Sequence, residues 1–230
     1  MPKSRITLPV IETTVRWIIT LLSLWAAYRY MLANDNVGLA SAILCASLAQ
    51  LAKPLQWLLR TRLPVSWRLV YLGFIIAAMY LGEIHSFFYR FLWWDDLLHT
   101  CSAMLITYVA FLGFRLLYGK EMKSSGLRPV LPAICVFFFT IGFGALWELL
   151  EFGADQLLGV NMLKGRDSTL PGSVYDYGRA LINTMQDLVL DAVGALIVAI
   201  GAWFSLAREG RFSKAFGYLI EQFIIANRSQ

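Results

Sequence analysis

Charged side chains are scarce in this sequence of 230 residues, because Asp, Glu, Lys and Arg together make up only 15% of it. Soluble domains carry about 25% charged residues, whereas here 58% of the residues are hydrophobic and the mean hydropathy is +0.61. This composition excludes an ordinary soluble protein. It predicts a protein that is embedded in a lipid bilayer.

Cysteine is also rare, and several familiar catalytic motifs are missing. Cys45, Cys101 and Cys135 are odd in number and lie within apolar stretches, which argues against a disulfide framework and a thiolate metal site. The chain has no Ser-His-Asp arrangement, phosphate loop or H-E-x-x-H motif. Its net charge is +5, but the basic residues are scattered, so we expect no nucleic-acid partner.

What the sequence does contain is a series of long apolar runs. An α-helix needs about 20 such residues to cross a bilayer, and each run reaches that length. The runs cover about 14–33, 38–59, 66–88, 96–118, 129–157 and 180–206. We therefore predict an all-α, polytopic membrane bundle of six transmembrane helices, forming a single integral membrane domain over residues 1–230.

The distribution of Lys and Arg predicts the orientation of these helices. When the connections are counted alternately, 15 basic residues fall on one side and 5 on the other. The positive-inside rule then places both termini in the cytoplasm. The connection at 158–178 faces outward and is too polar to span, and it is either a lid over a site or solvent-exposed slack. Segment 212–227 has the pattern of an amphipathic helix on the cytoplasmic surface.

Acidic and histidine residues gather in the outward halves of the last four spans. Charges at membrane depth are costly, so such residues usually face the interior of a bundle and mark a site. The gathered residues are Glu83, His85, Asp95, Asp96, His99, Glu148, Glu151, Asp155, Asp187 and Asp191.

Their spacing places most of them on single helix faces. Asp95 and His99 are four residues apart, and Glu148 and Glu151 are three apart. Asn183, Asp187 and Asp191 continue this polar stripe on the last span, and Gly194 after them lets another helix approach closely. The strongest candidates for a shared site are Asp95, His99, Glu148, Glu151, Asp187 and Asp191. Glu83 and His85 fit an interfacial position as well as a site, and Asp96 and Asp155 fit helix caps or contact with water.

Several carboxylates in a medium of low dielectric must take up protons, pair with cations or bind metal. Basic residues are few on this side of the membrane, so we put a divalent metal first. A proton or monovalent-cation relay and a buried structural network remain the alternatives. Carboxylates with imidazole suit zinc, manganese or iron, and oxygen ligands alone suit magnesium or calcium.

These motifs resemble the YjdF-like family of bacterial inner-membrane proteins and, more distantly, the VanZ-like family. The resemblance covers about 90–200 and rests on D-D-L-L-H from Asp95 to His99, W-E-L-L-E-F around Glu148, and the Asp-rich helix from Asn183 to Ala195. It implies a multi-pass protein of the bacterial inner membrane and supports the same choice of residues.

The chain also departs from these patterns. Asp96, Glu151 and Asp191 stand where the VanZ-like pattern has Lys, Gln and Asn, and Asn183 stands where YjdF-like sequences carry Asp. Each of the first three changes makes the site more acidic. This favours metal binding over a VanZ-like role.

Three functions are compatible with the sequence. The first is a metal-dependent hydrolase or transferase that acts on a lipid or lipid-linked envelope substrate, with Asp187 and His99 in catalysis. The second is a non-catalytic envelope factor with a structural polar core. The third is a transporter of a divalent cation or proton, although the inward halves of the last three spans are almost wholly apolar. We rank the enzyme first, because acids on one side suit surface chemistry better than passage.

Overall fold

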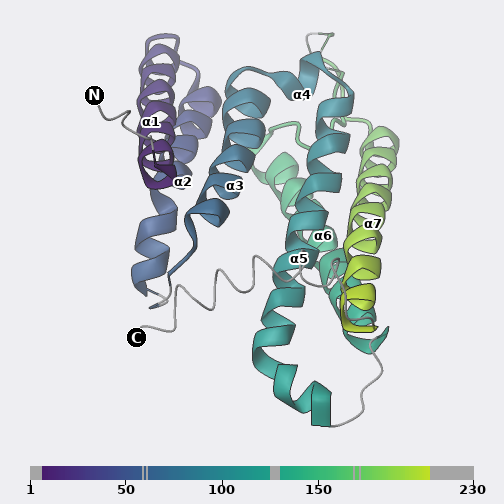
Figure 1. Ribbon diagram of the computed structural model, residues 1–230. Coiled ribbons are helices and arrows are strands. Elements are labelled where there is room, and N and C mark those ends of the chain that lie inside the picture. Colours follow the sequence, from purple (N-terminus) through teal and green to yellow (C-terminus); the bar gives the residue numbers. More distant parts are fainter. Residues whose placement is uncertain are drawn as a thin grey trace, which may run out of the picture. The chain divides into compact units, whose positions relative to one another are not determined.

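The computed structural model describes residues 7–58, 60, 62–124, 130–167, 169–170 and 172–207, with the backbone alone over 116–124 (Figure 1). Within these residues, six helices are long and apolar enough to cross a membrane, which confirms the predicted polytopic helical bundle. The predicted amphipathic segment 212–227 lies outside the described residues. The described chain divides into two compact units, one up to Trp94 and one from Asp95, and each is considered by itself.

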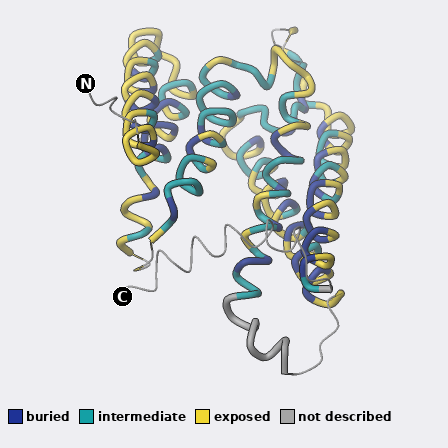
Figure 2. Tube along the Cα trace, in the orientation of Figure 1, coloured by how far each residue is buried: buried dark blue, intermediate teal, exposed yellow. Residues whose placement is uncertain are grey.

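Unit 1 contains α1 (Leu8–Leu32), α2 (Asn36–Leu58), α3 (Val65–Ile75), the π-helical segment η1 (Ile76–Ile84) and the short α4 (Phe87–Arg90). Small residues on α2 let its backbone lie close to the neighbouring helices, because Ala42, Cys45 and Ala49 are fully buried. Ile19, Leu72 and Ile75 complete this core together with Cys45 and Ala49. Figure 2 shows that α1 buries one stripe and exposes the other.

A polar network lies within unit 1 that the sequence motifs did not reveal. Glu12 and Arg16 are 2% and 5% exposed, and the Glu12 carboxylate lies 3.5 Å from Arg16 Nε and 3.3 Å from Arg68 Nη2. Arg16 Nη1 donates to Gln50 Oε1 at 2.5 Å, and Gln50 Nε2 donates to Thr20 Oγ1 at 2.8 Å. Buried charges of this kind are stable only when they are paired and hydrogen-bonded.

Helix ends differ from the hydropathy boundaries where local chemistry intervenes. α1 begins at Leu8 and not near residue 14, because Pro9 is tolerated in a first helical turn and Glu12 has a partner on the next turn. The third span ends at Ile84 instead of 88, since Ser86 has a left-handed backbone (φ 58°) and stops the helix. The fourth helix begins at Trp93, so the indoles of Trp93 and Trp94 belong to its first turn.

Unit 2 is built from α5 (Trp93–Ser124), α6 (Val130–Leu158) and α7 (Tyr177–Ala207), which lie beside one another in Figure 1. Gly194 of α7 faces the backbone carbonyl of Thr100, and a Cβ atom there would collide with it, so α7 and α5 are in close contact. This confirms the prediction that Gly194 allows another helix to approach closely. Further along, the hydroxyls of Thr107 and Thr140 are hydrogen-bonded at 2.7 Å between α5 and α6.

Beyond this threonine pair, the described part of unit 2 forms an apolar cluster. Its buried members are Phe111, Ala133, Val136, Ala199 and Ala202. The buried acids and the histidine of the three helices gather at the opposite half of the unit, where the connection from α6 to α7 also lies.

Candidate functional site

His99 is the centre of the polar half of unit 2. It is 8% exposed and sits in the second turn of α5, where α5, α6 and α7 each present acids to it. Its Nε2 atom lies 3.9 Å from Asp95 Oδ1, 3.9 Å from Glu148 Oε1 and 4.0 Å from Asp187 Oδ2. Ligand atoms of Asp95, His99 and Asp187 all lie within 4.8 Å of one another, a spacing that a metal ion could bridge. We call Asp95, His99, Glu148, Asp187 and Asp191 the acid cluster.

The two ring nitrogens of His99 have different partners. Nδ1 donates a hydrogen bond to Asp191 Oδ1 at 3.3 Å, because a carboxylate can only accept. The other ring nitrogen, Nε2, faces the remaining three carboxylates. Gly144 of α6 leaves room for the Asp191 carboxylate, since a Cβ atom at that position would collide with Oδ2. A histidine held by a carboxylate on one nitrogen and open on the other is typical of metal ligands.

Buried carboxylate oxygens in the cluster lack well-formed hydrogen bonds. Among the described residues, both oxygens of Glu148 and Oδ1 of Asp187 are buried without a well-formed hydrogen bond, although the Thr184 hydroxyl interacts with the Glu148 carboxylate. Glu148 is 4% exposed and Asp187 is 1% exposed. Asn183 Nδ2 donates to the other Asp187 oxygen, Oδ2. Unsatisfied buried acceptors of this kind call for an explanation, and an ion is one of the usual ones.

The charges of the acid cluster do not balance. Lys164, from the connection between α6 and α7, forms an ion pair with Asp95 and is the one lysine or arginine of the described residues that pairs with the cluster. Four carboxylates therefore face one ammonium and one imidazole. Even a protonated His99 would leave an excess of two negative charges.

The connection that carries Lys164 is a structured loop. The buried Asp155 carboxylate accepts hydrogen bonds from Met162 N at 2.6 Å, Leu163 N at 3.1 Å and the Tyr175 hydroxyl at 3.0 Å. The Arg166 guanidinium lies over the Tyr175 ring at 5.3 Å. Burial raises the pKa of Tyr175 to about 12, and its hydrogen bond to Asp155 acts in the same direction. The hydrogen bonds from Thr169 lower the pKa of Asp167 in the same loop.

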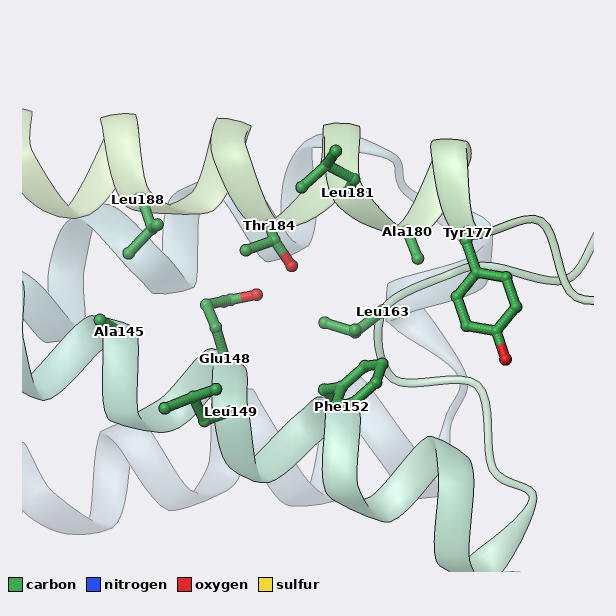
Figure 3. Close-up of a pocket in the computed structure, with 10 residues that line it drawn as sticks. All are labelled: Ala145, Glu148, Leu149, Phe152, Leu163, Tyr177, Ala180, Leu181, Thr184 and Leu188. Carbon is green, nitrogen blue, oxygen red and sulfur yellow. The ribbon is translucent and has the colours of Figure 1, made fainter.

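An apolar groove lies beside the acid cluster, between α6 and α7 (Figure 3). Its volume is about 480 Å³. Glu148 and Thr184 point into it from facing helices, and Leu163 of the loop projects into it between Phe152 and Ala180. The remaining residues that line it are Ala145, Leu149, Phe152, Tyr177, Ala180, Leu181 and Leu188.

Of the six strongest sequence candidates, the structure brings five together as the acid cluster. Glu151 is half-buried on α6, and it makes no hydrogen bond or ion pair with another described residue. The weaker candidates lie elsewhere. Asp96 is exposed, Asp155 anchors the loop, and Glu83 and His85 belong to unit 1, where His85 packs edge-on against Tyr80.

Sequence reasoning missed the partners that the loop contributes. The sequence marks Lys164 only as one of the few basic residues on the outward side, and it gives no signal for Leu163, because neither residue belongs to a periodic pattern. Their roles follow from the path of the loop, which a polar composition alone does not reveal. The one available hint was the length of the connection, since long loops in compact bundles are often functional.

Comparison with known proteins agrees with this architecture. A family model described as "Predicted membrane protein (DUF2238)" matches residues 11–208, a stretch that reaches into all six membrane-spanning helices. The chain belongs to this family. The DUF2238 match includes the whole acid cluster, and the YjdF-like resemblance fits the family.

One relative adds a partial match. The chain is similar to an uncharacterized protein of Thermotoga maritima, with 26% identity over 117 residues. These residues make up 50% of this chain and 57% of that protein, so the chain spans little more than half of this relative. No solved structure matches the chain.

Proposed function

We propose that the acid cluster binds a divalent metal ion and that the protein is a metal-dependent hydrolase or transferase acting on a lipid or lipid-linked substrate. The observation that carries this proposal is the set of buried carboxylate oxygens in the cluster that lack a well-formed hydrogen bond, namely both oxygens of Glu148 and Oδ1 of Asp187. Glu148 Oε1 lies 3.9 Å from His99 Nε2, and the other Asp187 oxygen, Oδ2, lies 4.0 Å from it. A divalent cation there would supply the two positive charges that the cluster lacks and would use those oxygens as ligands. Zinc, manganese, iron and magnesium are the candidates.

The residues of the cluster divide into three roles. Asp95, His99 and Asp187 hold the cation, and Asp191 orients the imidazole through Nδ1. The cation supplies charge that makes a neighbouring water a better nucleophile. Glu148 faces both the cluster and the groove, so its carboxylate is placed to take the proton of the attacking water. Glu151, one turn further along α6, remains a candidate ligand.

The proposed setting is the bacterial inner membrane, with the cluster on the outward side. This orientation rests on the distribution of Lys and Arg, and it gives the site access to lipids of the outer leaflet. The apolar cluster beyond Thr107 argues against a transport route, because residues 108–115, 130–139 and 199–206, which lie on that side of the threonine pair, include no acid. The distant VanZ-like resemblance remains an expectation from sequence.

A structural polar core is the second candidate, favoured by the Lys164–Asp95 ion pair and the His99–Asp191 hydrogen bond. In that case the Asp187→Asn variant would keep its hydrogen bond with Asn183 and lose a buried charge. Its melting temperature should then rise. If Asp187 binds metal, the same variant should melt at a lower temperature than the wild type whenever metal is present.

Elemental analysis of detergent-purified protein, prepared without chelator, tests the proposal. We expect about one divalent ion per chain, and strongly reduced occupancy in Asp187→Asn and His99→Ala, because each loses a direct ligand. Asp96→Asn is the matched control, since Asp96 is an exposed acid on the same helix. The proposal fails if the wild type contains no stoichiometric metal and if zinc, manganese and magnesium all leave its melting unchanged.

A further inference from the structure

We infer that the groove between α6 and α7 receives the apolar chain of a phosphorylated membrane lipid, and that Lys164 binds the lipid's phosphate beside the acid cluster. This inference rests on the proposed function, because it names the substrate class of the same site. Such a lipid has an apolar chain that matches the groove and a charged phosphate that matches Lys164.

The walls of the groove match a hydrocarbon chain. Seven of its ten lining residues have no side-chain oxygen or nitrogen, and the other three are Glu148, Thr184 and Tyr177. Leu149 and Leu181 are 65% and 57% exposed, so the groove opens outward from unit 2 within membrane-spanning segments. Its volume of about 480 Å³ lies in the range of about 300–1,000 Å³ that is typical of small-molecule sites. A chain that enters there exchanges one apolar environment for another and needs no route through water.

The groove borders the acid cluster, so it is not apolar along its whole length. Glu148 lines the groove, and its Oε1 atom lies 3.9 Å from His99 Nε2. Figure 3 shows its carboxylate between Thr184 and Leu163, inside the groove. A bound molecule must therefore have a polar group where its apolar part ends. This requirement excludes a plain hydrocarbon and a fully water-soluble metabolite.

Consecutive loop residues join the two halves of this site. Leu163 is 4% exposed and lies in the groove wall, whereas Lys164, the next residue, pairs with Asp95. Asp155 holds the backbone of this turn through Leu163 N. The Lys164 side chain remains 31% exposed, so its ammonium can also be reached from outside the cluster.

The charge of this ammonium selects the head group. Lysine binds phosphate as a compact point charge, and phosphate carries enough negative charge to interact with a bound cation and with Lys164 together. A neutral lipid would leave Lys164 with Asp95 alone. The geometry thus favours a lipid phosphate over a diacylglycerol or an alcohol.

Photocrosslinking of the full-length protein tests this inference. The probe is phosphatidic acid with a diazirine near the end of one acyl chain, and the control probe is the matching diacylglycerol. We expect labelling to fall on the peptides around Leu149 and Leu181. Ala145→Phe, which fills the groove, should reduce it several-fold, whereas Val189→Phe, an exposed position on α7 outside the groove, should not.

A second variant addresses the phosphate. Lys164→Gln should reduce labelling by phosphatidic acid and leave labelling by the diacylglycerol unchanged. Melting temperatures identify variants that fail to fold. If Ala145→Phe fails to fold, Leu181→Trp, at a more exposed position, fills the groove instead.

The outcomes separate this inference from the proposed function. The inference is overturned if neither groove variant reduces labelling. It is also overturned if phosphatidic acid and the diacylglycerol label both the wild type and Lys164→Gln equally. Crosslinks from the groove to a second copy of the chain would also overturn it. Phosphate-dependent labelling of protein that contains no metal would support the lipid site while removing the enzymatic proposal alone.

Discussion

A single imidazole organises the polar half of unit 2, because its two nitrogens are used differently. Nδ1 of His99 contacts Asp191, and Nε2 faces Asp95, Glu148 and Asp187. The sequence placed Asp187 and Asp191 on one stripe, but it could not distinguish their roles. The side of the ring that each carboxylate meets depends on how α7 packs against α5, which no spacing rule specifies.

This difference predicts unequal effects of matched substitutions. Asp191→Asn should weaken metal affinity by about 10–100-fold, because Asp191 acts through His99 and not on the metal. Asp187→Ala should abolish stoichiometric binding, because it removes a ligand. Competition with a fluorescent chelator measures both. Equal losses would instead mean that Asp191 is itself a ligand.

Tyr175 makes the contribution of the loop to stability depend on pH. Its pKa of about 12 exceeds the value of about 10 for an unperturbed tyrosine, because burial and the hydrogen bond to Asp155 favour the neutral phenol. A raised pKa contributes stability that is fully present below pH 10 and lost as the pH rises toward 12. The stability difference between wild type and Tyr175→Phe should therefore shrink over this interval.

Absorbance titration of tyrosinate provides the measurement. The wild type should show a step near pH 12 that is missing from Tyr175→Phe and retained in Tyr89→Phe, an exposed tyrosine of unit 1. If Tyr175→Phe titrates like the wild type, Tyr175 does not make the Asp155 contact in solution.

At the scale of helices, close packing depends on a glycine. A Cβ atom at Gly194 would collide with the Thr100 carbonyl and lie 3.1 Å from Ala103 Cβ. Gly194→Ala should therefore cost about 1–3 kcal/mol, because the backbones must separate. Gly142→Ala is the control, since nothing lies within 4 Å of that position and alanine favours helix by about 1 kcal/mol. Apparent melting temperatures in detergent should move in opposite directions, and a common direction would contradict this packing.

Hydropathy was sufficient to predict the six spans, because each must bury a continuous apolar surface in lipid. It could not predict η1, since a π-helical register changes hydrogen bonding without changing composition. It also missed the Glu12 and Arg16 network, because charges near the end of a span look like its polar flank. The acid cluster was predictable from helical spacing, whereas Lys164 was not, because it reaches Asp95 through a loop.

For the whole molecule, the asymmetry of basic residues predicts the direction of insertion. In a variant whose three native cysteines are replaced by alanine, a cysteine at Val174 should react with an impermeant reagent added outside intact cells. A cysteine at Ser124 should react only after lysis. Val174 is 88% exposed in the loop that carries Lys164. Reaction at Ser124 alone would place the acid cluster on the cytoplasmic side.

The Glu12 and Arg16 pair also bears on the order of biogenesis. Both residues belong to α1, which is synthesised before α2 brings Gln50 and α3 brings Arg68. A lone charge costs about 2.5–3.5 kcal/mol at the centre of an inserting helix and less near its end, where Glu12 and Arg16 lie, and opposite charges one turn apart on the same helix lower this cost further. The first helix therefore enters the bilayer with its counter-ion already in place. Arg68 joins Glu12 and Arg16 only when α3 follows, and by then these two residues have already neutralised each other within α1.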